Sequence, residues 1–275
     1  MPWFPEFANA AELARQQARD AGHADPVGQY FTALNRGDTR LLEDAWPGRV
    51  VVFDPRAGEV HGHRQLRRFV NDNRSWQAKR HIRIDTVATT RAGDRAVVEL
   101  LAHLDGSDGA GEITWPVAVV AESPDDRSVT FRTYCSQRPL FGQHQLRAPI
   151  LEAAAVSPGD VAGRYLAALD AGDTEAIVAA FAADGYLCEP DGARFTQNGT
   201  PGLRSLFDGW FGAGGGIRLQ HCAVTDDAVR CALEYNCVRW GSRDLAPQAG
   251  LAVCERGPGG LLAAVRVYDD VERPA

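Results

Sequence analysis

The second half of the chain repeats the first half. The segment VGQYFTALNRGDTRLLEDAW, residues 27–46, recurs as AGRYLAALDAGDTEAIVAAF, residues 162–181, so that Tyr30 and Tyr165 stand 135 positions apart. The same spacing relates Glu99 to Glu234 farther along the chain. Because the agreement extends through most of each half, it indicates duplication of a whole domain and not a stack of short repeats.

The domain boundaries follow from the repeat. A length of 275 residues suits two domains of ordinary size. We predict an N-terminal extension at residues 1–24, a first domain at 25–139, a linker at 140–159 and a second domain at 160–275. The extension contains AELARQQARDAG, which suggests a short helix, and the linker contains Pro149 and Pro158, which are typical of a connection.

Each copy begins with helices and continues with strands. In the first copy, apolar spacing predicts a helix that starts near Val27 and ends at Gly37, a second helix capped by Asp38, and a third around residues 66–70. Strands are predicted at residues 50–55, 81–90, 95–104, 113–123 and 128–137. This order predicts an α+β fold in two copies, each a cone-shaped domain with a curved antiparallel sheet wrapped on helices around one cavity.

Composition narrows the classes of partner. The net charge is −7 and the pI is about 5.5, which does not favour binding to nucleic acid or to an anionic membrane. The sequence shows neither a secretory signal nor an apolar run long enough to span a membrane, so we expect a cytoplasmic protein. The six cysteines form no C-x-x-C pair, and we expect them to be buried and reduced. Lys79 is the only lysine, which argues against Schiff-base catalysis.

The order of elements, the phrase Y-x-x-A-L-x-x-G-D and a strand that ends in an acid followed by proline resemble the nuclear-transport-factor-2-like superfamily. The resemblance is to its ketosteroid-isomerase and polyketide-cyclase branch, and it covers residues 25–139 and 160–272. Domains of this superfamily commonly pair through their open sheets. The resemblance therefore implies an intramolecular pseudo-dimer, with further homo-oligomerisation possible.

The resemblance assigns roles to two pairs of residues. A tyrosine on the first helix, here Tyr30 and Tyr165, would hydrogen-bond the oxygen that gains charge. An acid before proline, here Asp54 and Glu189, would shuttle the proton. We expect Asp54 with Tyr30 to be the main pair and Glu189 with Tyr165 to form a second site. The tyrosine and the acid are 24 residues apart in both copies. An alternative interpretation is structural: the tyrosines would pack in the core and the acids would cap turns.

Further polar and aromatic residues are candidates for substrate binding. They are Trp115, Glu99, His103, Glu234 and Trp240. Strand alternation leaves open whether the two glutamates line a cavity or lie on the opposite sheet face. The isomerases of this family also place a second, neutral acid near residues 116–118 and 249–251, where this chain has no acid.

These residues predict acid–base chemistry without a metal or organic cofactor. A carboxylate enclosed in an apolar cavity has a raised pKa and becomes a usable base, and a tyrosine hydroxyl stabilises the developing oxyanion. We expect a cyclase or isomerase that acts on a small polyketide-like or polycyclic metabolite, in secondary metabolism. The alternatives are an epoxide hydrolase or epoxide-opening cyclase, and a non-catalytic small-molecule binding protein.

Overall fold

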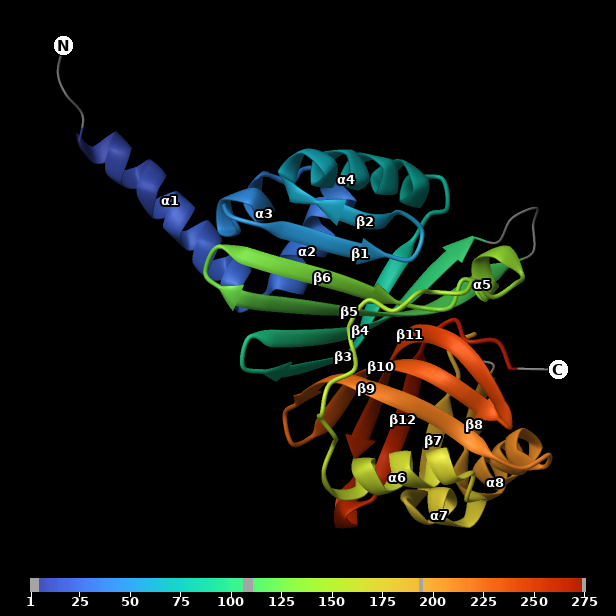
Figure 1. Cartoon of the computed structure of the whole chain (residues 1–275). Coiled ribbons are helices and arrows are strands. Elements are labelled where there is room, and N and C mark those ends of the chain that lie inside the picture. Colours follow the sequence, from blue (N-terminus) through green and yellow to red (C-terminus); the bar gives the residue numbers. More distant parts are fainter. Residues whose placement is uncertain (1–4, 106–110, 193–194, 274–275) are drawn as a thin grey trace. The chain divides into compact units, whose positions relative to one another are not determined.

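The computed structural model describes residues 5–105, 111–192 and 195–273, and it contains two mixed α and β assemblies (Figure 1). Two six-stranded sheets have the orders β2-β1-β6-β5-β4-β3 and β8-β7-β12-β11-β10-β9. Adding six to each strand number of the first order produces the second. The α+β fold in two copies is therefore confirmed.

The elements of the first repeat follow the predicted order. The helices are α1 (Pro5–Ala24), α2 (Pro26–Arg36), α3 (Arg40–Ala45) and α4 (Gly62–Ala78), followed later by the short α5 (Arg138–Phe141). The strands are β1 (Val50–Asp54), β2 (Gly58–His61), β3 (Arg83–Ala92), β4 (Arg95–Asp105), β5 (Glu112–Asp125) and β6 (Ser128–Tyr134). Strand β2 was not predicted, because its four residues, GEVH, are too few to show a strand pattern.

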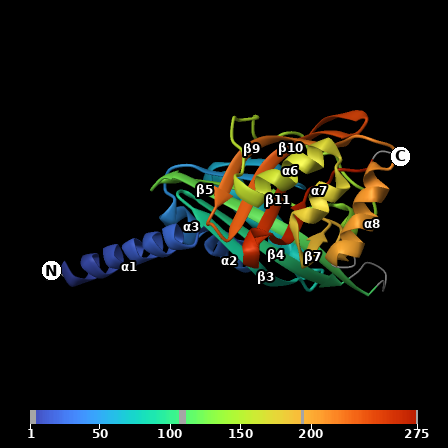
Figure 2. The ribbon, with the colours of Figure 1, turned by 90° about the horizontal axis from the view of Figure 1, so that it is seen from below.

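The second repeat contains counterparts of α2, α3 and α4 and of all six strands. Its helices are α6 (Asp160–Ala171), α7 (Thr174–Ala179) and α8 (Gly199–Phe211). Its strands are β7 (Phe181–Cys188), β8 (Thr196–Asn198), β9 (Gly216–Asp226), β10 (Arg230–Gly241), β11 (Arg243–Arg256) and β12 (Leu262–Tyr268). The pairs β9–β10, β10–β11, β11–β12 and β7–β8 are antiparallel, whereas β7 runs parallel to β12. Helices α6, α7 and α8 lie together against this sheet (Figures 1 and 2).

The chain divides into two compact units. Unit 1 comprises the part up to Ile82 together with Gly93–Val98 and Val119–Thr133. Unit 2 comprises Arg83–Ala92, Glu99–Ala118 and the chain from Tyr134 onward. Unit 2 thus contains the whole second repeat and some strand residues of the first. The domain boundaries drawn from the repeat remain a prediction.

Glycines end the first helix of both repeats. Gly37 and Gly172 have φ values of 69° and 71°, which is the left-handed region that glycine adopts without strain. At Gly172, a Cβ atom would lie 2.2 Å from the carbonyl oxygen of Gly215. The helix end therefore needs glycine both for its backbone angle and for the close approach of the loop before β9.

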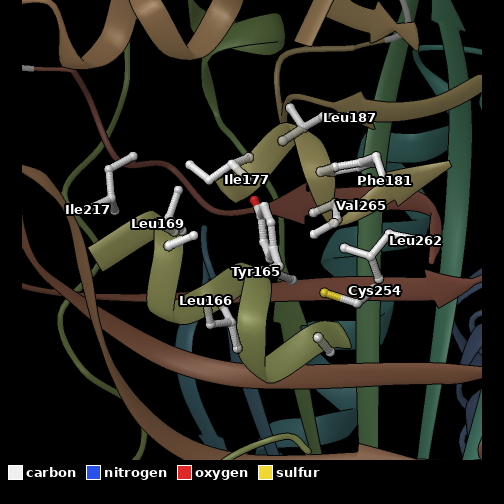
Figure 3. Packing of buried hydrophobic residues seen from close by; sticks show 14 of the residues in the cluster. Tyr165, Leu166, Leu169, Ile177, Phe181, Leu187, Ile217, Cys254, Leu262 and Val265 are labelled. Atoms are coloured by element: carbon white, nitrogen blue, oxygen red, sulfur yellow. The ribbon is translucent and has the colours of Figure 1, made fainter. Parts of the chain in front are cut away.

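The core of the second repeat forms between its helices and its sheet. Tyr165 and Leu169 of α6 pack in one buried cluster with Leu187, Leu262 and Val265 from the strands (Figure 3). Apolar residues three and four positions apart place one face of α6 toward the sheet. This packing fixes the position of Tyr165.

The predicted short helix of the extension is α1, which spans 20 residues. Within the described residues, none of the helices is long and apolar enough to cross a membrane. All six cysteines are free thiols, and five of them are buried, as expected.

Candidate active site

The second repeat encloses a cavity of about 280 Å³ between α6, α8 and its sheet. Its walls are largely apolar and include Leu166, Leu169, Leu187, Ile217 and Ala252. A smaller set of polar groups lines the same cavity: Tyr165, Glu189, Tyr235 and Asp269, with Arg138, His144 and Asp191 also at its surface. Apolar walls with a few polar groups are typical of small-molecule sites.

Tyr165 contributes a hydroxyl to this cavity. The residue is 3% exposed, and its ring packs edge-on against Phe181, with 5.7 Å between the ring centres. Burial raises the pKa of the phenol. Figure 3 shows the Tyr165 side chain leaving the middle of α6, with its hydroxyl pointing away from the helix among apolar side chains. Since no described residue forms a hydrogen bond with it, this hydroxyl is available to a ligand.

Glu189 stands directly after β7 and before Pro190. Burial raises the pKa of this carboxyl, and the nearby negative charge of Asp191 adds to the shift. A hydrogen bond from Gln197 and the positive charge of Arg138 act in the opposite direction. The net shift is upward, so Glu189 holds a proton more readily than an exposed glutamate.

Tyr235 and Asp269 form a pair that the sequence did not reveal. The Tyr235 hydroxyl donates a hydrogen bond to Asp269 Oδ2 over 2.6 Å, and the backbone N–H of Val271 donates to Oδ1 over 3.3 Å. Asp269 as a residue keeps some exposure, but its carboxyl is enclosed, and this burial raises its pKa to about 6.

Gly250 makes room for this pair. It lies opposite Tyr235 in the β10–β11 ladder. A Cβ atom at this position would lie 2.6 Å from the Tyr235 ring and 2.8 Å from the Asp269 Cβ. The resemblance would place a neutral acid in the strand segment 249–251. In this chain, the missing side chain of Gly250 leaves room there for Asp269, which follows β12.

The internal repeat contains a signal for this pair. Glu99 corresponds to Glu234, so the next residue, Leu100, corresponds to Tyr235. In the same way, Tyr134 corresponds to Tyr268, so Cys135 corresponds to Asp269. Both positions change from apolar or weakly polar residues in the first copy to polar residues in the second. A position-by-position comparison of the two copies would have placed them among several candidates.

Two tryptophans form the aromatic part of the cavity. Trp210 of α8 and Trp240 of β10 both line it, with ring centres 5.2 Å apart and planes at 63°. Trp240 was predicted as a binding residue, whereas Trp210 was not. Large flat rings at a cavity wall favour contact with an apolar or ring-shaped ligand.

The first repeat arranges the corresponding residues differently. Asp54 lines a polar groove of about 430 Å³ beside α4. Its Oδ1 accepts hydrogen bonds from the backbone N–H groups of Arg56 and Ala57 over 2.9 and 2.8 Å, which closes a turn. Tyr30 is 1% exposed and stacks on Phe131 at 4.5 Å, and it does not line this groove. Burial and the charge of Asp54 raise the Tyr30 pKa.

Two predicted binding residues are the matching glutamates, and both are buried in unit 2. Glu99 forms an ion pair with Arg266, whose Nε and Nη2 atoms lie 2.5 and 3.0 Å from its oxygens, and it accepts a hydrogen bond from Tyr268 over 2.9 Å. Glu234 accepts a hydrogen bond from Tyr134 over 2.8 Å. Neither glutamate lines the cavity or the groove. Each instead accepts a hydrogen bond from the tyrosine at the end of the last strand of the other repeat.

Trp115 and His103 also lie away from the cavity and the groove. The Trp115 indole donates to the backbone carbonyl of Ser136 over 2.7 Å. The His103 ring nitrogens lie 3.1 Å from Asp85 and 3.3 Å from Glu112. The structure thus brings Tyr165, Glu189 and Trp240 together in one cavity, and it places the other predicted site residues elsewhere.

One family model matches part of the first repeat. Residues 27–131 match the family model of the SnoaL-like domain. A search of curated proteins found no significant match.

Solved structures match about two fifths of the chain, which is the length of one domain. A cystatin-fold protein from Novosphingobium aromaticivorans is 18% identical, with 39% of this chain and 94% of that chain covered and a TM-score of 0.34. A putative polyketide cyclase from Sinorhizobium meliloti is 17% identical, with 40% and 95% covered and a TM-score of 0.33. A protein with a ketosteroid isomerase-like fold from Catenulispora acidiphila, in complex with trimethylamine, is 17% identical, with 43% and 90% covered and a TM-score of 0.33.

Proposed function

We propose that this chain is an acid–base enzyme that acts in the cavity of the second copy. Residues 27–131 match the SnoaL-like domain, and the second half is a further copy of the same fold. It would isomerise or cyclise a small polyketide-like or polycyclic metabolite without a cofactor. One observation carries the proposal: Glu189 and Asp269, two carboxyl groups with raised pKa values, line a single apolar cavity. Carboxyl groups with such shifts are concentrated at catalytic sites.

The proposed reaction begins with removal of a proton. The Glu189 carboxylate takes a proton from a carbon next to a substrate carbonyl, and the electron pair moves onto the carbonyl oxygen. The Tyr165 hydroxyl, which has no partner among the described residues, donates a hydrogen bond to that oxygen. Glu189 then returns the proton to another carbon of the enolate, which is an isomerisation. Alternatively, the enolate attacks a second carbonyl, which closes a ring and forms an alkoxide that takes the proton from Glu189.

Asp269 supplies a second group that exchanges a proton near neutrality. With a pKa of about 6, it is a carboxylate over most of the neutral range and accepts the Tyr235 hydrogen bond. Exclusion of water by a bound ligand strengthens the electrostatic interactions in the cavity. Asp269 in its protonated form can then donate a hydrogen bond to a substrate oxygen.

The cavity also restricts the substrate. Its volume of about 280 Å³ lies at the lower end of the roughly 300–1,000 Å³ that small-molecule sites span. Apolar walls and the Trp210–Trp240 pair favour a compact and largely uncharged molecule with a planar ring.

The test is ring opening of 5-nitrobenzisoxazole, a small planar probe that reacts when a base removes one C–H proton. We expect Glu189→Gln to lower kcat/KM by about 10²-fold or more, the usual contribution of a positioned base. Glu152→Gln is the matched control, because Glu152 is exposed and outside the cavity. Asp54→Asn is expected to leave the rate unchanged, since Asp54 lies in a separate groove.

Two results would contradict the proposal. If Glu189→Gln retains the wild-type rate, Glu189 is not the base. If the wild-type protein binds the probe in the second cavity and leaves it unreacted, the chain is a binding protein, which is the alternative that the sequence left open.

A further inference from the structure

The rim of the cavity includes residues from outside the second repeat. Arg138 of α5 and His144 line the cavity, although both lie in the connection between the repeats. Ser136, at the start of this connection, donates its hydroxyl to Asp191 or to Asp270, each 2.8 Å away. We refer to residues 136–145 as the rim segment. The site of the second repeat therefore depends on chain that the sequence analysis divided between the first domain and a linker.

His144 is held in one orientation by a buried acid. Its Nδ1 lies 2.9 Å from Asp270 Oδ1, and Asp270 is 4% exposed. The other carboxylate oxygen of Asp270 accepts the backbone N–H of Gln145 over 2.9 Å. Because Asp270 accepts bonds from several donors of the rim segment, it is fixed and acts as the acceptor for the Nδ1 proton. A hydrogen bond at one ring nitrogen determines what the other nitrogen can do.

The second ring nitrogen of His144, Nε2, forms no hydrogen bond with a described residue. Nε2 lies 3.8 Å from Asp191 Oδ2, which is beyond the length of a hydrogen bond. Asp191 is engaged elsewhere, since it receives the Arg138 guanidinium over 2.6 Å. Since His144 lines the cavity and its Nδ1 is committed to Asp270, its Nε2 proton is the one available for transfer.

The charged groups around His144 come from three elements. Asp269 and Asp270 follow β12, Asp191 follows β7, and Arg138 belongs to α5. The hydrogen bond to Asp270 and the charges of Asp191 and Asp270 raise the pKa of His144, while burial and Arg138 lower it. The net shift is upward, which favours the imidazolium form of His144.

We propose that His144 is the general acid of this cavity and that Asp270 positions it. This inference rests on the proposed function. As Glu189 takes a C–H proton, the C–H electron pair forms a new π bond, a bond to a substrate oxygen breaks, and that oxygen takes the Nε2 proton of His144. Glu189 is left protonated and His144 neutral, and transfer of one proton between them through water restores both. The substrate class is a compound whose reaction releases a basic oxygen.

Two probes separate a general acid from a structural residue. Benzisoxazole and 5-nitrobenzisoxazole both need a base for the same C–H proton, but benzisoxazole releases a more basic phenolate, which depends more on protonation. We expect His144→Gln to reduce kcat/KM for benzisoxazole at least tenfold more than for the nitro compound. We expect Glu189→Gln to reduce both rates to a similar extent, because base catalysis is common to both probes.

The matched control is His221→Gln. His221 is a half-buried histidine of the same repeat, and its Nδ1 lies 3.0 Å from the backbone oxygen of Val156. It does not line the cavity, so this variant is expected to keep the wild-type rates with both probes.

The wild-type pH profile is a second test that does not require a variant to fold. The benzisoxazole rate is expected to fall as the pH rises through the pKa of His144, and the nitrobenzisoxazole rate to fall much less. In Asp191→Asn the fall is expected at lower pH, because a charge that raises this pKa is removed.

The outcomes distinguish the two proposals. Equal losses for both probes in His144→Gln, or superimposable wild-type pH profiles, would overturn the role of His144 and leave Glu189 as the base. If the wild-type protein opens neither probe, both the proposed function and the role of His144 are overturned.

Discussion

The raised pKa of Asp269 predicts a specific dependence of stability on pH. The group titrates at about 6 in the folded chain and near 3.8 when unperturbed, so the folded state binds its proton more tightly than the unfolded state. Stability from this group is therefore lost as the pH rises from the unperturbed to the folded pKa. The full loss is about 3 kcal/mol, of which about 1 kcal/mol falls between pH ~5 and pH ~8.

The variant Asp269→Asn removes this dependence. Asparagine stays neutral and can still accept the Tyr235 hydrogen bond through its amide oxygen. We expect wild-type protein to lose about 1 kcal/mol more of its unfolding free energy than Asp269→Asn between pH ~5 and pH ~8. Urea unfolding followed by tryptophan fluorescence at the two pH values measures the difference. Comparing the two proteins subtracts other groups that titrate in this range.

Tyr235→Phe provides the opposite change. The Tyr235 hydrogen bond lowers the Asp269 pKa, so its loss raises that pKa further and extends the range over which stability falls with pH. Parallel pH dependences for wild type and Asp269→Asn would refute the reasoning. They would mean that the Asp269 carboxyl is not desolvated in the folded protein and that the cavity contains one perturbed acid instead of two.

Three further predictions address the packing and the chemistry of unit 2. Gly250→Ala is expected to lower the unfolding free energy by about 1–3 kcal/mol, because its Cβ would lie 2.6 Å from the Tyr235 ring. Gly209→Ala is the control and is expected to be neutral or stabilising, because no atom lies within 4 Å of its Cβ. Urea unfolding measures both variants. Glu99→Gln is expected to cost about 3 kcal/mol, because it breaks a buried ion pair with Arg266, and a urea midpoint within error of wild type would contradict this. Tyr165→Phe is expected to slow nitrobenzisoxazole opening by about tenfold or more while leaving the unfolding free energy within about 1 kcal/mol of wild type, and an unchanged rate would exclude Tyr165 as the hydrogen-bond donor.

The architecture could be predicted because it depends on local patterns that occur twice. Apolar spacing, the two helix-ending glycines and the strand segments each appear in both copies at a constant offset, so the elements of one copy support those of the other. The cavity residues Tyr165 and Glu189 were found for the same reason, since each belongs to a motif with a fixed position in the fold.

The remainder of the site depends on contacts that no local pattern encodes. Asp269 enters the cavity because Gly250, on a different strand, leaves space for it. His144 lies at the cavity rim because Asp270, far away in the sequence, accepts its ring proton. The motif around Asp54 looked equivalent to that around Glu189, but two backbone N–H groups of the following turn bind Asp54 instead.

The two copies differ in the side chain that packs beside the tyrosine of the first helix. In the first copy, Val52 of β1 is opposite Phe131 of β6, and the Phe131 ring stacks on Tyr30. In the second copy, the matching register places Leu187 opposite Val265, so no aromatic ring fills that position beside Tyr165.

The loss of this ring coincides with a gain of polar groups. Tyr235 and Asp269 replace Leu100 and Cys135 of the first copy, and both line the cavity of the second. An aromatic core stabilises a domain, whereas an enclosed carboxyl with a raised pKa destabilises it at neutral pH. The first copy therefore has a stabilising ring stack beside Tyr30, whereas the second has an enclosed carboxyl that lowers its stability at neutral pH.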